Sequence, residues 1–260
     1  DAMQGDPVTI HVLDGGGEKQ IESVVAHGWA PGSGGENPAL GVRGLRLLLK
    51  ETELFETQLA AILRAAMRGP VRVLLPMVTT PGEIATAREC YERVARRLKR
   101  RGLDLPDPLP PLGIMIETPG AALAADSLAL EADFFAIGTN DLAMYTLAVD
   151  RAESEAAHLY DPLHPAVLRL MQFATEAALR MRMPVSVCGE IAGDPRLTPL
   201  LLGLGIRSLS MSSGAVPRVK QAVRSVAIDD CARFARTVME QSDPARIAEL
   251  VAGFWQKLEA

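Results

Sequence analysis

The sequence predicts an α/β protein built as a (β/α)8 TIM-type barrel. Short β-branched or apolar runs alternate with longer amphipathic stretches along almost the whole chain, a pattern typical of βα units around a parallel sheet. Polar and charged residues follow several of these runs, where such barrels carry their functional groups. With 260 residues, 48% of them hydrophobic, the chain is long enough to form one such domain over residues 1–260.

Six runs are predicted to be strands because they combine β-branched and apolar residues. In chain order they are residues 8–13, 71–78, 112–117, 133–139, 185–190 and 207–212. A weaker seventh strand is expected at residues 40–44. A closed barrel of this type has eight strands, so one strand and its helix are expected to be absent from this chain.

Helices are predicted between the strands wherever apolar residues recur at spacings of three and four. The expected helices cover residues 53–67, 81–101, 119–130, 165–182, 195–203, 215–225 and 243–258. Thr80 and Pro81 mark the start of the second helix, because Thr caps helix starts and Pro suits the first turn. The glycine-rich stretches 14–19 and 31–38 are expected to be loops, and neither resembles a phosphate-binding P-loop.

Composition excludes several classes of partner. The chain has 27 Lys and Arg against 32 Asp and Glu, so its charge gives no reason to expect nucleic acid or an anionic membrane. No apolar run is long enough to span a membrane and no signal peptide precedes the first strand. Three cysteines without metal or disulfide spacing suit a reducing compartment, and the chain is expected to be cytoplasmic.

Two carboxylates leave apolar strands at their carboxyl ends. Glu117 follows "GIMI", and Asp141 follows "AIGTN". A pair of carboxylates on neighbouring strands suits Mg²⁺, which takes one or two carboxylates together with substrate oxygens. The alternative is that either carboxylate caps a helix or pairs with an arginine.

Arginines on the same expected face suit an anionic ligand. The guanidinium of Arg43 matches phosphate and carboxylate in bidentate fashion, and Arg151 follows Asp141 closely enough for both to serve one ligand; a surface ion pair is the alternative for Arg151. Arg72 lies early in its strand, so a structural salt bridge is the expected role. His158 and His164 lack partners at metal-ligand spacing and are expected to cap helices or form hydrogen bonds.

Cys188, in "PVSVCGEIA", lies at the end of a predicted buried strand. A thiol there can act as a nucleophile or can give and take a proton. Cys90 and Cys231 fall in helical stretches and are expected to be inert core residues.

Read in order, the strand-end segments resemble the C-terminal domain of Enzyme I, the phosphoenolpyruvate–protein phosphotransferase of the bacterial sugar phosphotransferase system. The resemblance covers residues 36–226 and rests on these segments: "NPALGVRGLRLLL", "LLPMV", "GIMIETPGAALAAD", "DFFAIGTNDLAMYTLAVDR", "HLYDPLHPAVLRL" and "VCGEIAGDP". Pyruvate phosphate dikinase and phosphoenolpyruvate synthase share the barrel, but "TLAVDR" and "HLYDPLHPAV" are more similar to Enzyme I.

The resemblance implies a role for each candidate residue. It implies that Glu117 and Asp141 hold Mg²⁺, that Asn140 and Asp141 bind phosphoenolpyruvate, and that Arg43 and Arg151 clamp its phosphate or carboxylate. It also implies that Cys188 protonates the enolate carbon to give pyruvate. In the family the phosphoryl group passes to a histidine on an N-terminal domain and then to a small phosphocarrier protein, and the barrel domain forms a homodimer.

The sequence departs from the family pattern at three places. The phosphohistidine domain is expected to lie outside this chain, as is the family's first barrel strand. "VTIHVLDGGGEK" aligns with a family segment similar to "VIVRTLDIGGDK", which places His11 where a substrate-binding arginine is expected. Histidine is shorter and largely neutral at neutral pH, so a weaker anion clamp is expected, with Lys19 partly compensating.

Two other functions remain open at this stage. The chain is alternatively a non-catalytic dimerisation or ligand-sensing remnant of the same fold, because an incomplete barrel exposes strand edges that association would cover. A pyruvate phosphate dikinase-like role would require an ATP-binding domain that this sequence does not contain.

Overall fold

A computed structural model describes Met3 and residues 5–14, 39–150 and 156–259. The chain divides into two compact units. The first comprises Asp1–Met115 with Leu130–Phe134, and the second comprises Ile116–Ala129 with Phe135–Ala260. Within the described residues, no helix combines the length and apolar character needed to span a bilayer.

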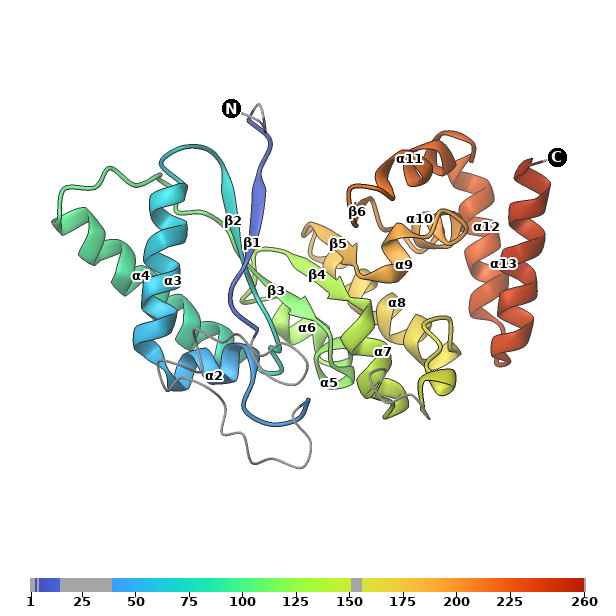
Figure 1. Ribbon diagram of the computed structural model, residues 1–260, viewed down its shortest axis with the longest axis horizontal. Coiled ribbons are helices and arrows are strands. Elements are labelled where there is room, and N and C mark those ends of the chain that lie inside the picture. Colours follow the sequence, from blue (N-terminus) through green and yellow to red (C-terminus); the bar gives the residue numbers. More distant parts are fainter. Residues whose placement is uncertain (1–2, 4, 15–38, 151–155, 260) are drawn as a thin grey trace. The chain divides into compact units, whose positions relative to one another are not determined.

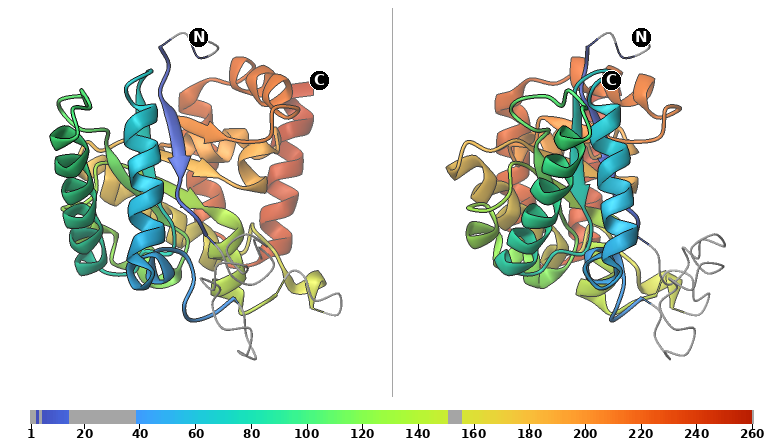
Figure 2. Two further views of the ribbon diagram at one scale, coloured as in Figure 1. Left: turned by 60° about the vertical axis from the view of Figure 1, so that its left-hand side comes forward. Right: turned by 90° about the vertical axis from the view of Figure 1, so that its left-hand side faces the viewer.

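The first unit contains parallel strands covered by long helices. Strand β2 lies between β1 and β3 and pairs in parallel with both, with Ile10 opposite Val73 and Leu75 opposite Ile114. Helices α3 and α4 lie side by side beside these strands (Figures 1 and 2). The elements of this unit, with β3 ending one residue beyond it, are β1 (Val8–His11), α2 (Gly44–Lys50), α3 (Thr52–Ala65), β2 (Val71–Leu75), α4 (Pro81–Arg100) and β3 (Leu112–Ile116).

The second unit contains the other three described strands. Strands β4, β5 and β6 pair in parallel, with Gly138 opposite Cys188 and Cys188 opposite Ser210. The strands of this unit are β4 (Phe135–Gly138), β5 (Val185–Cys188) and β6 (Ser208–Ser210). Its helices are α5 (Pro119–Leu123), α6 (Ala125–Leu128), α7 (Thr139–Leu147), η1 (Ala157–Leu159), α8 (Pro165–Arg180), α9 (Glu190–Gly193), α10 (Thr198–Gly203), α11 (Val216–Arg224), α12 (Ile228–Met239) and α13 (Pro244–Glu259).

Side chains of strands and helices form the core of each unit. In the first unit α3 contacts β2, and Phe55 and Leu63 of α3 and Val73 and Leu75 of β2 are all fully buried. In the second unit Phe135, Ile137 and Val187 of the strands are fully buried, as are Val167 and Met171 of α8. Burial of one such side chain stabilises the fold by roughly 1.5–3 kcal/mol. The apolar residues of the strands therefore contribute much of the stability of each unit.

Capping signals in the sequence coincide with helix starts. Thr80 accepts a hydrogen bond from the Glu83 backbone N–H, and the Glu83 carboxylate accepts one from the Thr80 N–H, forming a complete capping box at α4. His164 Nδ1 accepts from the Ala166 N–H at 3.2 Å at the start of α8, which confirms its expected capping role.

The α/β class and the six main strands are confirmed, whereas the expected strand at 40–44 is wrong. Residues 39–43 form turns and bends, and Gly44 begins helix α2. The expected helix 119–130 is interrupted at Ala124, which separates α5 from α6. Helices α7 and α12 were not anticipated; Gly138 and Ala227 precede them, and neither provides a side-chain cap that marks a helix start.

Candidate functional site

In the second unit, the turns after β4 and β5 are joined by hydrogen bonds around Cys188. The Thr139 hydroxyl donates to the Cys188 carbonyl oxygen at 2.8 Å, and the Glu190 backbone N–H donates to Asn140 Oδ1 at 3.1 Å. The Cys188 thiol donates to the Ile137 carbonyl oxygen at 3.4 Å. The first residues of α7 are therefore joined by side-chain hydrogen bonds to the segment Cys188–Glu190 that follows and ends β5.

Gly189 makes this close approach possible. Its φ of +101° lies in the region that favours glycine. A Cβ atom at this position would lie 2.4 Å from Thr139 Oγ1 and 2.8 Å from Asn140 Oδ1. The glycine after Cys188 thus lets the two turns share hydrogen bonds, and it was not singled out for this role from the sequence.

Glu117 and Asp141 also belong to the second unit. Glu117 follows β3 and is 4% exposed, and half-buried Asp141 lies in the first turn of α7. Residues described in the structure include no group of three or more His, Cys, Asp or Glu side chains that could hold a metal ion.

In the first unit, Arg43 forms a buried ion pair with Asp14. Arg43 Nε donates to Asp14 Oδ1 at 3.1 Å and Nη2 donates to Oδ2 at 2.6 Å. Gly44 has a φ of +55°, and a Cβ there would lie 2.7 Å from Met77 Cβ and 3.3 Å from Asp14 Oδ1. Asp14 therefore occupies Nε and Nη2 of Arg43 and orients its guanidinium.

Four further residues were discussed from the sequence, namely His11, Arg151, Lys19 and Arg72. His11 ends β1, and its Nδ1 lies 2.6 Å from the Val12 carbonyl oxygen. Arg151 and Lys19 lie outside the described residues, so their expected roles stay predictions. Arg72 keeps a structural role, but its guanidinium lies 5.7 Å from the centre of the Phe134 ring, a cation–π contact rather than the expected salt bridge.

The other two cysteines are core residues, as expected. Cys90 is 3% exposed and Cys231 is fully buried. Burial raises the pKa of both thiols, and the charge of Asp230 raises that of Cys231 further. Cys188 is only half-buried, which makes it the most accessible of the three.

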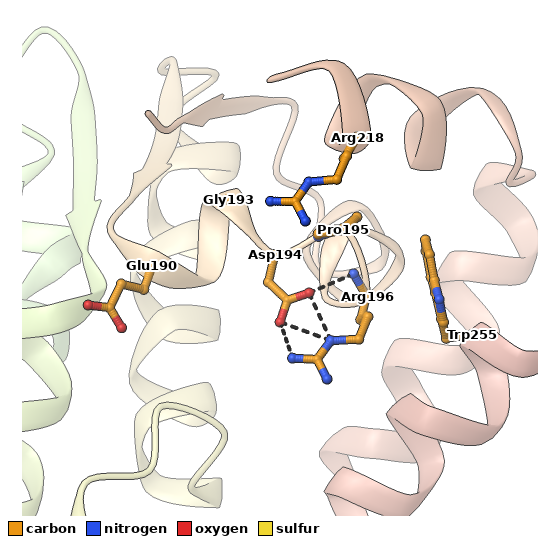
Figure 3. Close-up of a pocket in the computed structure, with 7 residues that line it drawn as sticks. All are labelled: Glu190, Gly193, Asp194, Pro195, Arg196, Arg218 and Trp255. Carbon is orange, nitrogen blue, oxygen red and sulfur yellow. Dashed lines mark hydrogen bonds and ion pairs between the residues drawn. The ribbon is translucent and has the colours of Figure 1, made fainter. Parts of the chain in front are cut away.

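The second unit also contains a pocket that was not predicted from the sequence. It is bordered by Glu190 of α9, the Asp194–Arg196 pair, Arg218 of α11 and Trp255 of α13 (Figure 3). Its lining residues are spread over more than sixty positions, and no short motif connects them. Only the packing of the helices brings them together.

The fold and these residues define the chain as a member of a known class. Residues 1–228 match the family model described as PEP-utilising enzyme, PEP-binding domain, and the chain belongs to this family. The phosphoenolpyruvate-protein phosphotransferase of Cupriavidus necator is 44% identical over 247 residues, which cover 94% of this chain and 41% of that protein.

Two further relatives extend the comparison. The phosphoenolpyruvate-protein phosphotransferase of Haemophilus influenzae is 39% identical over 254 residues, 98% of this chain and 43% of that protein. A multiphosphoryl transfer protein of Xanthomonas campestris pv. campestris is 43% identical over 252 residues, 96% of this chain and 28% of that protein. The chain therefore spans less than half the length of these relatives.

Among solved structures, a citrate lyase of Burkholderia xenovorans LB400 matches with a TM-score of 0.49 and 19% identity. The match covers 78% of this chain and 67% of that one.

Proposed function

We propose that this chain is the phosphoenolpyruvate- and Mg²⁺-binding catalytic domain of a phosphoenolpyruvate–protein phosphotransferase. The proposal is supported by family membership and by similarity to proteins with that name over almost the whole chain. The observation that carries it is the arrangement of Cys188 beside Thr139 and Asn140 at the ends of β4 and β5. In such an enzyme the phosphoryl group leaves phosphoenolpyruvate for a protein histidine, and pyruvate is released.

Cys188 is proposed to be the proton donor. Loss of the phosphoryl group leaves the enolate of pyruvate, which becomes pyruvate when its methylene carbon takes up a proton. The Cys188 S–H bond breaks in this step, the new C–H bond forms, and the thiolate regains a proton from solvent. The Ile137 carbonyl oxygen accepts a hydrogen bond from the thiol at 3.4 Å, which orients the S–H group.

The charged residues are proposed to hold the substrate. Glu117 and Asp141 would bind Mg²⁺, which neutralises the charge that develops on the transferred phosphoryl group. Arg43 and Arg151 would bind the phosphate or carboxylate of phosphoenolpyruvate, with Asn140, His11 and Lys19 completing the site. Asp14 orients Arg43 for this role through two hydrogen bonds.

The proposal extends to the complete protein. We propose that the six described strands belong to an eight-stranded barrel formed with parts of a longer cytoplasmic protein. Phosphoryl transfer to a phosphocarrier protein would then use an N-terminal domain that lies outside this chain, and two copies would associate through the barrel domain.

Calorimetric titration with phosphoenolpyruvate tests the proposal. Binding is expected in the presence of Mg²⁺, and it should weaken at least about tenfold in Glu117→Gln, the loss expected when one charge-assisted contact is removed. Glu249→Gln, which removes an exposed carboxylate of α13, serves as the matched control. Absence of heat at millimolar ligand, with circular dichroism showing a folded chain, would contradict the proposal.

A further inference from the structure

A second cavity of the second unit lies between helix α13 and two turns, outside the residues assigned to phosphoenolpyruvate. Its volume is about 540 Å³, and sites for small organic molecules usually fall between about 300 and 1,000 Å³. One turn, residues 161–163, precedes α8, and the other, residues 194–197, joins α9 to α10. The cavity therefore has room for one small organic molecule.

Most of the cavity wall is apolar. Ala248, Val251 and Ala252 line it from one side of α13, because helix residues three and four apart are neighbours. Leu163 and Leu197 line it from the two turns. Val251 and Leu197 are each only 6% exposed. An apolar group placed against this wall would be removed from water, which favours its binding.

Contacts with α12 hold the helical side of the wall in position. The ring of Phe254 stacks on Phe234 of α12 with the ring centres 4.4 Å apart. Ile247 lies seven positions before Phe254, and therefore on the same side of α13, and it is fully buried. The residues that line the cavity occupy a different side of α13, so anchoring the helix against α12 leaves them facing the cavity.

Asp161 gives the cavity an available carboxylate oxygen. Its Oδ1 accepts a hydrogen bond from the Leu163 backbone N–H at 2.8 Å, whereas Oδ2 has no hydrogen bond or ion pair with another described residue. Asp161 is half-buried and lines the cavity. A carboxylate in this position gains most from a positively charged N–H donor, such as an ammonium group.

The second carboxylate of the lining is already paired. Asp194 Oδ1 accepts hydrogen bonds from the Arg196 backbone N–H and Nε at 2.9 and 3.0 Å, and Oδ2 accepts from Nη2 at 2.6 Å (Figure 3). Nη1 of Arg196 makes no hydrogen bond within the part of the chain that the structure describes. Arg196 can therefore donate to an anionic group, while the charge of Asp161 alone is left to be neutralised.

We propose that this cavity binds an α-amino acid with an apolar side chain. The ammonium group donates to Asp161 Oδ2, the carboxylate accepts from Arg196 Nη1, and the side chain lies against the apolar wall. An apolar amine would lack the contact with Arg196, and an apolar acid would meet the negative charge of Asp161 without neutralising it. This inference does not depend on the proposed binding of phosphoenolpyruvate, because no residue assigned to that substrate lines the cavity.

L-Leucine is the probe, and two analogues each lack one of its charged groups. Isoamylamine is leucine without the carboxylate, and isocaproic acid is leucine without the ammonium group. Saturation-transfer NMR on the unsubstituted chain should show leucine binding that saturates by about 10 mM, an affinity within reach of a ligand of this size.

The two analogues should bind more weakly than leucine, to different extents. Isocaproic acid should bind at least about tenfold more weakly, because it loses a charge-assisted hydrogen bond to a half-buried carboxylate. Isoamylamine should bind about two- to fivefold more weakly, because the Arg196 side chain is 63% exposed and solvent screens its contact.

Two Asp→Asn substitutions give a matched comparison. Asp161→Asn keeps an acceptor for the Leu163 N–H but removes the charge, so leucine should bind at least about tenfold more weakly. Asp243 makes a similar turn, in which Oδ1 accepts from the Ala245 N–H at 3.0 Å, but it does not line the cavity. Asp243→Asn should therefore bind leucine like the parent.

Filling the cavity from α13 tests the apolar wall. Ala248 is exposed and lines the cavity, so Ala248→Phe should place its ring where the leucine side chain lies and weaken binding at least about tenfold. Ala245 is exposed on the same helix and does not line the cavity, so Ala245→Phe should bind like the parent. Circular dichroism checks that all four variants are folded.

Any one of four results would overturn the inference. They are absence of saturation with leucine at about 10 mM, isoamylamine or isocaproic acid binding as tightly as leucine, equal affinities of folded Asp161→Asn and Asp243→Asn, and equal affinities of folded Ala248→Phe and Ala245→Phe. The comparison of leucine with its analogues needs no substitution, so it decides the matter even where a variant does not fold.

Discussion

Asp14 and Arg43 form a bidentate ion pair whose side chains are only 4% and 5% exposed. The pair joins the segment that follows β1 to the start of α2, both in the first unit. The two residues are 29 positions apart in the sequence. A buried guanidinium requires both a counter-charge and hydrogen-bond acceptors. Asp14 supplies both to Arg43.

Asp14→Asn is therefore expected to destabilise the chain. An amide keeps a similar shape but removes the negative charge that faces the buried Arg43 guanidinium, and breaking a buried ion pair in this way typically costs about 3–5 kcal/mol. Urea unfolding followed by circular dichroism measures the loss. Glu249→Gln breaks the exposed Arg246–Glu249 pair and should change stability by less than about 1 kcal/mol; equal effects of the two substitutions would contradict a structural role for Asp14.

Gly189→Ala should destabilise the second unit. The new Cβ would lie 2.4 Å from Thr139 Oγ1, and the backbone would keep a φ of +101°. Thr139 is fully buried and bonded to the Cys188 carbonyl oxygen, so it has little room to yield. Strain of this kind costs of the order of 1–3 kcal/mol, measured as a fall in the melting temperature.

Gly120→Ala is the matched control for that experiment. Gly120 lies in α5 with nothing within 4 Å of an added Cβ. Alanine favours helix over glycine by about 0.5–1 kcal/mol, so this variant should be neutral or slightly more stable. A Gly189→Ala protein that melts with the parent would show that the two turns are not tightly joined.

Alkylation should distinguish Cys188 from the other two thiols. Burial raises the pKa of Cys90 and Cys231, so neither forms much of the reactive thiolate near neutral pH. Half-buried Cys188 is expected to take up iodoacetamide first, as followed by mass spectrometry of the native chain. Cys188→Ala should then label only after denaturation, and rapid labelling of native Cys90 would contradict the described core.

The Asp194–Arg196 pair predicts a dependence of stability on pH. Since the pKa of Asp194 is lowered from its ordinary 3.8, the pair contributes fully above pH 3.8 and its contribution is lost as the pH falls through the lowered native pKa. Arg196 is 63% exposed, so solvent screening keeps the contribution to at most about 1 kcal/mol. Urea midpoints at a series of acidic pH values should show this loss in the parent chain and not in Asp194→Asn.

Cys188→Ala separates binding from proton transfer. In the complete enzyme we expect phosphoenolpyruvate to bind almost as in the parent, because the thiol makes no charged contact with it, while release of pyruvate is abolished. Coupled detection of pyruvate measures the second effect. Retained turnover would remove Cys188 from the mechanism, whereas loss of binding alone would indicate a structural role.

Local pattern was sufficient for the strands and for several helix starts. The six main strands were predicted because buried parallel strands consist of nearly continuous β-branched and apolar residues, as in "VRVLL" and "FAIG". The start of α4 was predicted because Thr80 and Pro81 carry a signal within a few residues of each other. The 40–44 segment was misassigned because its alternating pattern does not show that Arg43 turns inward to Asp14.

The sequence by itself determined the class of fold, the order of its strands and the motifs that point to a phosphoenolpyruvate site, since each depends on neighbours along the chain. Only the tertiary structure showed that Asp14 pairs with Arg43 and that Gly189 leaves space for the side chains of Thr139 and Asn140. It also showed that Arg218 and Trp255 line the same pocket. These relationships join side chains that are tens of residues apart, and only packing determines which distant groups share a hydrogen bond or a cavity.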